Sequence, residues 1–352
     1  MDTHTPFSRD HASDALVERK LASFGKLTTD ALRGYLPAGG HHDYLGALVA
    51  DYPTRGGKML RPALCLATAC AFGAQAEDAL GCAVAIELIH NALLIHDDIE
   101  DDSEQRRGRP TLHALHGVPL ALNAGDALGM LSMRPLRDNA RRLGPFTANR
   151  IVEETELMAW ETAGGQAMEL GWRRDNRLDL EDSDYLTMVL KKTCWLTTIY
   201  PMRVGCMIGG GTQRQMEAIF RLGFFFGAAF QIQDDLLNLE GDVAYGKEIC
   251  GDLLEGKRTL MLLHGLRHAK PAERRRLLRF LETPRARRKP ADVAWIRALL
   301  VDTGAMAHSR ATAELLTGAA RYEFEQAFGG VADSEDKQFL HALIAWVLRR
   351  IH

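Results

Sequence analysis

The sequence has few of the features that mark secreted or nucleic-acid-binding proteins. Its cysteines form no CxxC pair and are scattered through apolar stretches: Cys65, Cys70, Cys82, Cys194, Cys206 and Cys250. We therefore expect buried, reduced thiols in a cytosolic protein, and neither disulfides nor a zinc site. The first six residues are polar and lack the apolar core of a signal peptide. Because the formal net charge is −3, there is no overall positive field to attract nucleic acid.

Strand patterns are also scarce, and no uncharged apolar run reaches the length needed to span a membrane. Apolar residues recur instead at helical spacing. Clusters of glycine and proline near residues 36–40, 144–145, 209–211 and 329–330 mark expected helix ends. With 46% hydrophobic residues and no shift in composition, the sequence predicts a single all-α domain over 15–352. A polar, disordered tail is expected at 1–14.

A strongly basic stretch runs from Glu273 to Pro290. We interpret it as a solvated surface helix and loop. Contact with an anionic membrane or with nucleic acid fits less well, because the whole chain is acidic.

The most informative segment is 87–113, where an apolar helical pattern leads into three carboxylates. Asp97 and Asp101 are four residues apart, and Asp98 is three before Asp101, so on a helix all three share one face. Like charges placed in this way repel one another, and a divalent cation would relieve the repulsion. Magnesium prefers hard oxygen ligands, commonly one or two carboxylates together with substrate phosphates.

The residues that follow favour a diphosphate site over an exposed acidic helix end, which would show the same DDxxD pattern. Arg106, Arg107 and Arg109 come soon after the carboxylates. Guanidinium groups make bidentate hydrogen bonds to phosphate oxygens. Metal-holding carboxylates beside arginines therefore predict that a diphosphate binds there.

A second helical pattern, within 224–259, ends in the acidic pair Asp234 and Asp235. Phe230 and Phe226 lie one and two turns before Asp234 on the same face. Each phenylalanine alone is more typical of ordinary core. Two such helices facing each other would nevertheless form a deep apolar pocket with a charged, metal-binding mouth. That shape suits an amphiphile with a diphosphate head and a hydrocarbon tail.

Taken in order, these features resemble the trans-isoprenyl diphosphate synthase (polyprenyl synthetase) family, and within it the geranylgeranyl diphosphate synthases, over nearly the whole chain from about residue 45. The family's motifs appear as Gly56-Gly57-Lys58-Met59-Leu60-Arg61-Pro62, Asp97-Asp98-Ile99-Glu100-Asp101 with Arg106-Arg107-Gly108, Gly165-Gln166, Lys192-Thr193, Gln231-Ile232-Gln233-Asp234-Asp235, and the lysines Lys247 and Lys257. The resemblance implies the isoprenoid synthase fold, a bundle of roughly ten or more helices around a deep central cavity. It also implies head-to-tail condensation of isopentenyl diphosphate with allylic diphosphates, by a homodimer.

The resemblance assigns an expected role to each motif residue. Three magnesium ions, for which manganese can substitute, would be held by Asp97, Asp101 and Asp234, with Asp98 and Asp235 in support. The allylic diphosphate would be contacted by Arg106, Lys192, Gln231, Lys247 and Lys257. Isopentenyl diphosphate would be bound by Lys58, Arg61, His90 and Arg107. Thr193 would help to stabilise the developing allylic cation.

His90 could also be an ordinary core histidine. Its place seven residues before Asp97, on the same helical face, favours the site.

Four residues depart from the family pattern: Met59, Glu169, Cys194 and Asn238. None of them replaces a primary ligand, so we expect activity.

Product length depends on the floor of the pocket, expected at Ala92 and Leu93, with Ile89, Ile86, Met130 and Met133 as further candidates. No aromatic residue stands one turn before the first aspartates, which favours a C20 product and leaves C15 or C25 and longer open. A class I terpene cyclase and a non-catalytic partner subunit are the two rival interpretations. The residues expected to bind isopentenyl diphosphate, Lys58, Arg61 and Arg107, argue against a cyclase. The two intact aspartate motifs argue against a non-catalytic subunit.

Overall fold

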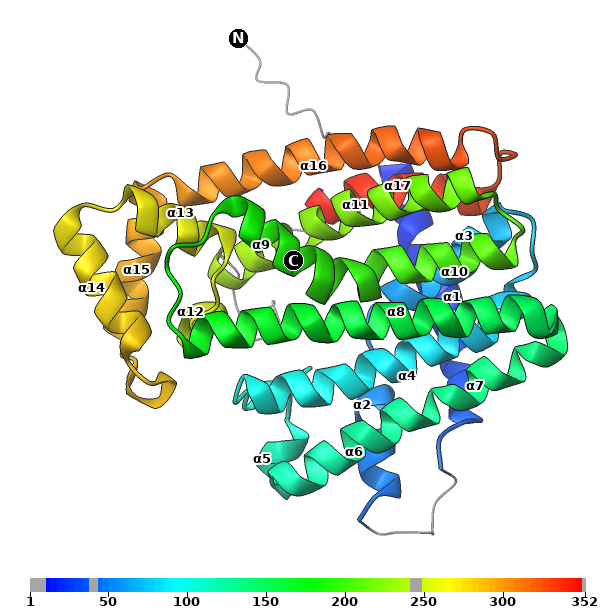
Figure 1. The fold of residues 1–352 in the computed structure, drawn as a ribbon, viewed down its shortest axis with the longest axis horizontal. Helices are drawn as coiled ribbons and strands as arrows, with labels where there is room; N and C mark the ends of the chain where they lie inside the picture. The colour runs from blue at the N-terminus through cyan, green and yellow to red at the C-terminus, as the bar shows by residue number, and fades with distance from the viewer. Residues whose placement is uncertain (1–10, 38–43, 241–248, 350–352) are drawn as a thin grey trace.

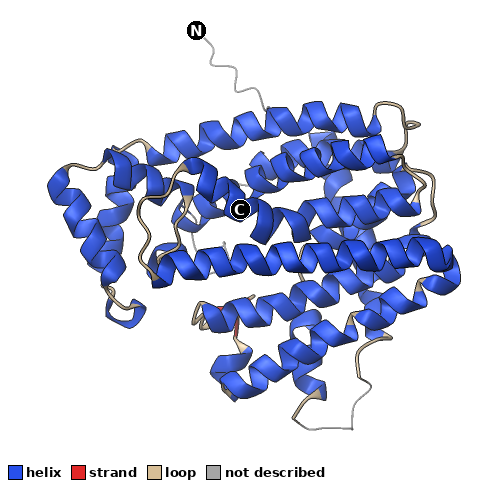
Figure 2. Cartoon of the chain, in the orientation of Figure 1, coloured by secondary structure: helices blue, strands red, loops and turns tan. Residues whose placement is uncertain are grey.

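The computed structural model describes residues 11–37, 44–240 and 249–349, and this part of the chain is almost entirely helical (Figures 1 and 2). The first half contains α1 (His11–Arg33), α2 (Gly46–Thr54), α3 (Leu60–Ala71), α4 (Ala76–Glu100), α5 (Leu112–His116), α6 (Val118–Leu131), α7 (Met133–Asp138) and α8 (Ala140–Arg174). Two short strands, β1 (Gln105–Arg106) and β2 (Arg109–Pro110), pair as an antiparallel hairpin after α4.

The second half contains α9 (Asp182–Val189), the π-helix η1 (Leu190–Ile199), α10 (Tyr200–Ile208), α11 (Gln213–Glu240), α12 (Gly251–Glu255), α13 (Leu260–His268), α14 (Pro271–Glu282), the 3-10 turn η3 (Arg285–Arg287), α15 (Pro290–Asp302), α16 (Ala305–Phe328) and α17 (Glu335–Arg349). The predicted all-α bundle is confirmed.

Residues 11–14 were expected to belong to a disordered tail, and in the structure they are helical. Residues 11–14 form the first turn of α1, where the carboxylate of Asp14 complements the positive end of the helix dipole. Residues 1–10 lie outside the described part of the chain.

The expected helix ends mark real breaks. Gly144 has a φ of 75° inside α8, which a residue with a Cβ would adopt only under strain, and Pro145 restarts the helix after it. Gly209 caps the end of α10, and Gly329 follows α16.

Helix α4 is central and packs against α3, α6 and α7, while α11 packs along α16 and η1 (Figure 1). By length and composition α4 is apolar enough to cross a membrane, although the charged residue Glu87 interrupts its apolar run. Of its most apolar window, 61% is buried inside the protein, as in the core helix of a bundle. Helices α13, α14 and α15 gather at one end of the molecule (yellow in Figure 1).

Candidate active site

One cavity of about 1270 Å³ brings the predicted motifs together. Its wall is formed mainly by α4, α8, η1 and α11, with the β1–β2 hairpin and the segment around α12. Most of the predicted site residues line it: Lys58, Arg61, His90, Leu93, Asp97, Asp101, Arg106, Arg107, Lys192, Thr193, Gln231, Asp234, Asp235 and Lys257. Of the remainder, Lys247 lies outside the described residues.

The first aspartate motif ends α4 and is surrounded by cations. Asp97 Oδ1 lies 3.3 Å from Lys192 Nζ, and Asp101 Oδ2 lies 2.9 Å from Lys257 Nζ. Burial alone would raise the pKa of Asp97, but Lys192, Lys257 and Arg106 outweigh it and hold the pKa below its usual range. The carboxylate therefore stays ionised at neutral pH.

Asp98 does not face the cavity but anchors the arginine after it. Its carboxylate accepts hydrogen bonds from Arg106 Nε at 2.9 Å, from Arg106 Nη2 and from the hydroxyl of Tyr52 on α2. Asp98 is fully buried and is not among the lining residues. In this structure the carboxylate of Asp98 holds Arg106, and its expected support of the metal ligands stays a prediction.

Arg55, just after α2, organises the hairpin that carries Arg106 and Arg107. It donates to the main-chain oxygens of Arg106 at 3.0 Å and of Pro110 at 2.8 Å. The guanidinium of Arg107 lies over Gly57, where an added Cβ would be 3.0 Å from Nη2. Sequence reasoning missed Arg55. The feature of the sequence that could have indicated it is a cationic residue directly before Gly56 and Gly57.

The second aspartate motif is held by a chain of hydrogen bonds. Thr193 Oγ1 donates to Gln231 Oε1 at 2.9 Å, and Gln231 Nε2 donates to Asp235 Oδ1 at 2.7 Å. The hydroxyl of Tyr185 on α9 donates to Asp235 Oδ2 at 2.8 Å. Burial, helped by the charge of Asp252, raises the pKa of Asp235 well above its usual range. Tyr185 lies outside any motif, so its contact with Asp235 could not be predicted from the sequence.

A close approach of α8 to η1 sets the position of Lys192. A Cβ on Gly165 would lie 2.1 Å from the backbone nitrogen of Lys192, so only glycine permits this contact. The contact brings Glu169 Oε2 to 2.9 Å from Lys192 Nζ. Burial alone would lower the pKa of Lys192, but Glu169 and Asp97 raise it above its ordinary value. This lysine is therefore charged, and it lies on a π-helix, a distortion common at functional sites.

Arg173 of α8 is a further cation that sequence reasoning missed. It donates to Asp101 Oδ1, whereas Lys257 contacts the other carboxylate oxygen, Oδ2. Its position in an ordinary helical pattern, outside every motif, gave no signal.

A second group of basic side chains also lines this cavity. Arg61 Nη1 is 3.2 Å from His90 Nε2, and Arg61 Nη2 donates to Thr197 Oγ1 at 2.8 Å. Burial lowers the pKa of Arg61 to about 10, so it remains charged. Burial, with the charges of Arg61 and Arg107, lowers the pKa of His90 well below its usual value. His90 is therefore a neutral member of this group.

Comparison with known proteins agrees with this geometry. The family model described as Polyprenyl synthetase matches residues 42–300. The chain belongs to the polyprenyl synthetase family. A short chain isoprenyl diphosphate synthase of Methanothermobacter thermautotrophicus is 39% identical over 229 residues, 65% of this chain and 69% of the relative. A geranylfarnesyl diphosphate synthase of Aeropyrum pernix is 31% identical over 304 residues, 84% of this chain and 91% of the relative.

Solved structures show the same likeness. A geranylgeranyl pyrophosphate synthetase from Pyrococcus horikoshii matches with a TM-score of 0.83 at 30% identity, over 96% of this chain and 99% of that one. A polyprenyl synthase from Caulobacter crescentus, complexed with calcium and isoprenyl diphosphate, matches with a TM-score of 0.82 at 27% identity, over 96% and 98%. The predicted family and fold are confirmed, and the protein is a prenyltransferase of the polyprenyl synthetase family.

Three departures from the polyprenyl synthetase pattern have a structural explanation. Asn238 Oδ1 accepts a hydrogen bond from the backbone N–H of Asp252 at 3.1 Å, so it ties α11 to α12. Cys194 is buried against Gly227, where an added Cβ would be 2.8 Å from its Sγ. Met59 adopts the left-handed conformation at the start of α3 and lines the cavity.

The expected floor of the polyprenyl synthetase pocket needs correction. Leu93 lines the cavity, but Ala92 and Ile89 are not among the lining residues. Ala92 is 5% exposed and faces α6, where its Cβ would lie 3.9 Å from a Cβ on Gly129. Ile89 packs against the main core instead.

Two further residues that the sequence analysis considered for the pocket floor do not lie in the pocket. Met130 and Met133 are exposed, because they lie on the outer side of α6 and at the start of α7. Of the two phenylalanines expected in the pocket, Phe230 lines it and Phe226 is buried core.

The donor set of this polyprenyl synthetase suits a hard divalent cation. Asp97, Asp101 and Asp234 line one cavity, and Glu169 has a buried oxygen, Oε1, with no hydrogen-bond partner. Carboxylate-only donors favour magnesium over zinc or copper. Within the described ranges, no three His, Cys, Asp or Glu side chains stand close enough together to hold an ion without rearrangement. Lys192 and Lys257 instead pair with the α4 carboxylates.

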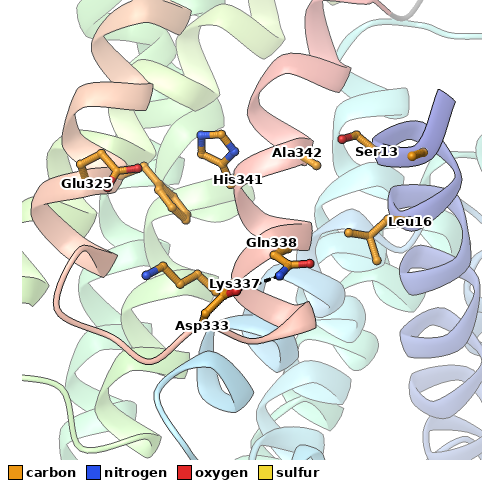
Figure 3. Close-up of a pocket in the computed structure, with 10 residues that line it drawn as sticks. Ser13, Leu16, Glu325, Asp333, Lys337, Gln338, His341 and Ala342 are labelled. Carbon is orange, nitrogen blue, oxygen red and sulfur yellow. Dashed lines mark hydrogen bonds between the residues drawn. The ribbon is translucent and has the colours of Figure 1, made fainter. Parts of the chain in front are cut away.

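A second pocket, of about 530 Å³, lies on the outside of the bundle between the start of α1 and helices α16 and α17 (Figure 3). Gln338 Nε2 donates to Asp333 Oδ2 at 3.0 Å in its wall. None of the predicted site residues lines this pocket.

Proposed function

We propose that this prenyltransferase condenses isopentenyl diphosphate head to tail with allylic diphosphates and releases mainly geranylgeranyl diphosphate, C20. The observation that carries the proposal is that one cavity holds two groups of basic side chains with different partners. Lys192, Lys257 and Arg106 pair with the carboxylates of the first aspartate motif, whereas Arg61 contacts His90 and Thr197 and the guanidinium of Arg107 lies over Gly57. A reaction that joins two diphosphates needs two anion sites, and an enzyme that ionises a single diphosphate needs one.

The allylic diphosphate would bind at the aspartate motifs. Magnesium, held by Asp97, Asp101 and Asp234 with three ions in all, would neutralise the leaving diphosphate as a Lewis acid. Lys192 and Lys257 are held by neighbouring carboxylates, so they are positioned before any substrate arrives. Thr193 would present its hydroxyl oxygen toward the developing cation, fixed in orientation by its hydrogen bond to Gln231.

Isopentenyl diphosphate would bind on the side formed by Lys58, Arg61, His90 and Arg107. Because His90 is neutral, it would accept or donate a hydrogen bond without adding charge. The double bond attacks the cation, and the proton is lost to the departing diphosphate. Apolar residues of the wall, such as Leu93, Leu196 and Phe230, would exclude the water that otherwise quenches the cation to an alcohol.

The C20 length is supported by the non-aromatic side chain of Leu93 in the cavity wall and by the name of the similar Pyrococcus horikoshii structure, a geranylgeranyl pyrophosphate synthetase. A longer product has support too, because one relative carries the name of a C25 synthase. The test is to incubate purified protein with magnesium, labelled isopentenyl diphosphate and a C5, C10 or C15 allylic starter, and to size the dephosphorylated products. A labelled C20 alcohol supports the proposal. No incorporation of label, with hydrocarbon released from a C15 or C20 starter, would identify a cyclase.

We also propose that the enzyme acts as a homodimer in the cytoplasm. Large apolar side chains of α6 and α8 are exposed, among them Met130, Phe146 and Trp160. Both helices flank α4, and a second copy would cover their apolar faces. The six cysteines are free, as expected for a reducing compartment.

A further inference from the structure

Helices α4 and α12 both end at the mouth of the cavity, and neither has a basic residue in its last turn. The last carbonyl groups of a helix have no partner within it and carry a partial negative charge. A cation from elsewhere in the chain therefore has a defined place to bind at each of these ends.

The turn η3, between α14 and α15, and the residue directly after it supply two cations, Arg285 and Arg288. Arg285 Nη1 donates to the main-chain oxygen of Asp101, the residue that caps α4, at 3.0 Å. The same Nη1 lies 3.2 Å from Oε1 of Glu255, the last residue of α12. One guanidinium thus joins the ends of two helices that are about 150 residues apart in the sequence.

Arg288, directly after η3, completes the connection. Its Nη1 donates to the main-chain oxygens of Leu253 at 3.1 Å and Leu254 at 2.7 Å, in α12. Its Nη2 donates to the oxygen of Leu281 at the end of α14. The basic stretch was expected to be solvated surface. That expectation holds for Arg287, which is exposed, and fails for Arg285 and Arg288, which are largely enclosed by these carbonyl groups.

The two segments that these arginines join each carry a group of the diphosphate site. Asp101 ends the first, and Lys257 follows α12 by two residues, with its Nζ 2.9 Å from Asp101 Oδ2. We propose that Arg285 and Arg288 are positioning residues, which hold the first aspartate motif and Lys257 next to each other at the site where the metal–diphosphate group binds. The proposal rests on the metal–diphosphate role of this site proposed above, and not on the length of the product.

The test measures binding of methylene bisphosphonate with magnesium by titration calorimetry, in wild type, Arg285→Ala, Arg285→Lys and Arg287→Ala. Arg287 is the matched control, because it lies in the same turn and carries the same charge without these contacts. We expect Arg285→Ala to weaken binding about tenfold, which corresponds to about 1.4 kcal/mol. Arg285→Lys should recover part of the loss, since an ammonium group can still reach one carbonyl, and Arg287→Ala should bind as wild type does.

Steady-state kinetics give a second measurement. The KM for the allylic diphosphate should rise in Arg285→Ala, and the KM for isopentenyl diphosphate should not. Arg288→Ala would remove the hydrogen bonds to the main-chain oxygens of Leu253, Leu254, Leu281 and Thr283, so Arg288→Lys is the better second variant. It should weaken bisphosphonate binding in the same direction.

Three outcomes would overturn the positioning role. In the first, Arg285→Ala binds the bisphosphonate as tightly as Arg287→Ala does, whether or not its melting temperature falls. That result would show that Arg285 contributes only to the stability of the fold. In the second, both KM values rise equally. In the third, wild type itself fails to bind bisphosphonate with magnesium. That result would remove the proposed diphosphate site, and it is distinguishable from the first two because no variant is needed to see it.

Discussion

The hydroxyl of Tyr185 on α9 donates to Asp235 Oδ2 at 2.8 Å, and the hydroxyl of Tyr52 on α2 makes the corresponding bond to Asp98. The second aspartate of each motif is therefore buried and tied by a tyrosine from a separate helix. The first aspartate of each motif, Asp97 or Asp234, is not among the buried residues and lines the cavity. Each aspartate pair thus has one partly exposed residue that lines the cavity and one buried residue that is held by a tyrosine.

Replacing Tyr185 with phenylalanine tests this division of roles. The change removes a hydrogen bond to a buried carboxylate whose pKa burial already raises, so the charged form of Asp235 loses support. A hydrogen bond to a charged group contributes about 1.5 to 3 kcal/mol, so we expect kcat to fall roughly tenfold or more and the magnesium requirement to rise. Rates measured across a magnesium titration check this.

Tyr200→Phe is the control for that experiment. The hydroxyl of Tyr200 lies 2.6 Å from Thr155 Oγ1, in the core and outside the cavity lining. This variant should lose a similar amount of stability and keep its magnesium requirement. An equal effect of both variants on the magnesium titration would mean that Tyr185 acts only through stability.

Much of this site was predictable because its chemistry depends on local spacing. The spacing of Asp97 and Asp101 places both on one helical face, and the structure puts both in the cavity. What the sequence could not show were contacts between distant segments. Tyr185, Arg173 and Arg285 lie outside every motif, and each reaches the site only through the packing of helices.

The errors have a similar origin. Periodicity shows that Ala92 is on an apolar face, but α4 is buried on nearly all sides, so it does not show which neighbour that face meets. Here the neighbour is α6 and not the cavity. The basic stretch after Glu273 was misread in part, because charge alone does not distinguish a solvated arginine from one enclosed by carbonyl groups.

Product length should respond to Ala92 even though it lies outside the cavity lining. A phenylalanine there cannot fit against Gly129, so its ring must displace α6 or turn toward the cavity. We expect Ala92→Phe to shift the main product from C20 toward C15, as measured by sizing the labelled alcohols. Gly129→Ala is the control, because its Cβ would make only an ordinary contact at 3.9 Å. An unchanged product distribution in Ala92→Phe would show that the ring displaces α6 and does not reach the cavity.

The stability of the fold should depend on pH through His90. Its pKa in the folded protein lies well below the ordinary 6.5, mainly because it is buried. Below pH 6.5 the unfolded chain therefore binds a proton that the folded chain does not, so the free energy of unfolding falls as pH falls. Above pH 6.5 both states carry a neutral ring, and the effect vanishes.

His90→Gln isolates this contribution, because every carboxylate stays the same. Urea unfolding at intervals from pH 7.5 to pH 5 should show wild type losing stability relative to the variant, by at most about 1.36 kcal/mol per pH unit. Parallel curves across the whole range would show that His90 is protonated in the fold as readily as in the unfolded chain.

The proposed homodimer depends on an apolar surface that the single chain leaves exposed. Trp160 on α8 is 78% exposed, and Met130 on α6 is 76% exposed. A buried tryptophan is among the residues that contribute most to an interface, commonly about 2 kcal/mol or more. Trp160→Glu should therefore turn a particle of twice the chain mass into a monomer in sedimentation equilibrium. Leu315→Glu is the matched control, because Leu315 is as exposed but lies on α16. A wild type that sediments as a monomer, or equal dissociation of both variants, would contradict an interface at α6 and α8.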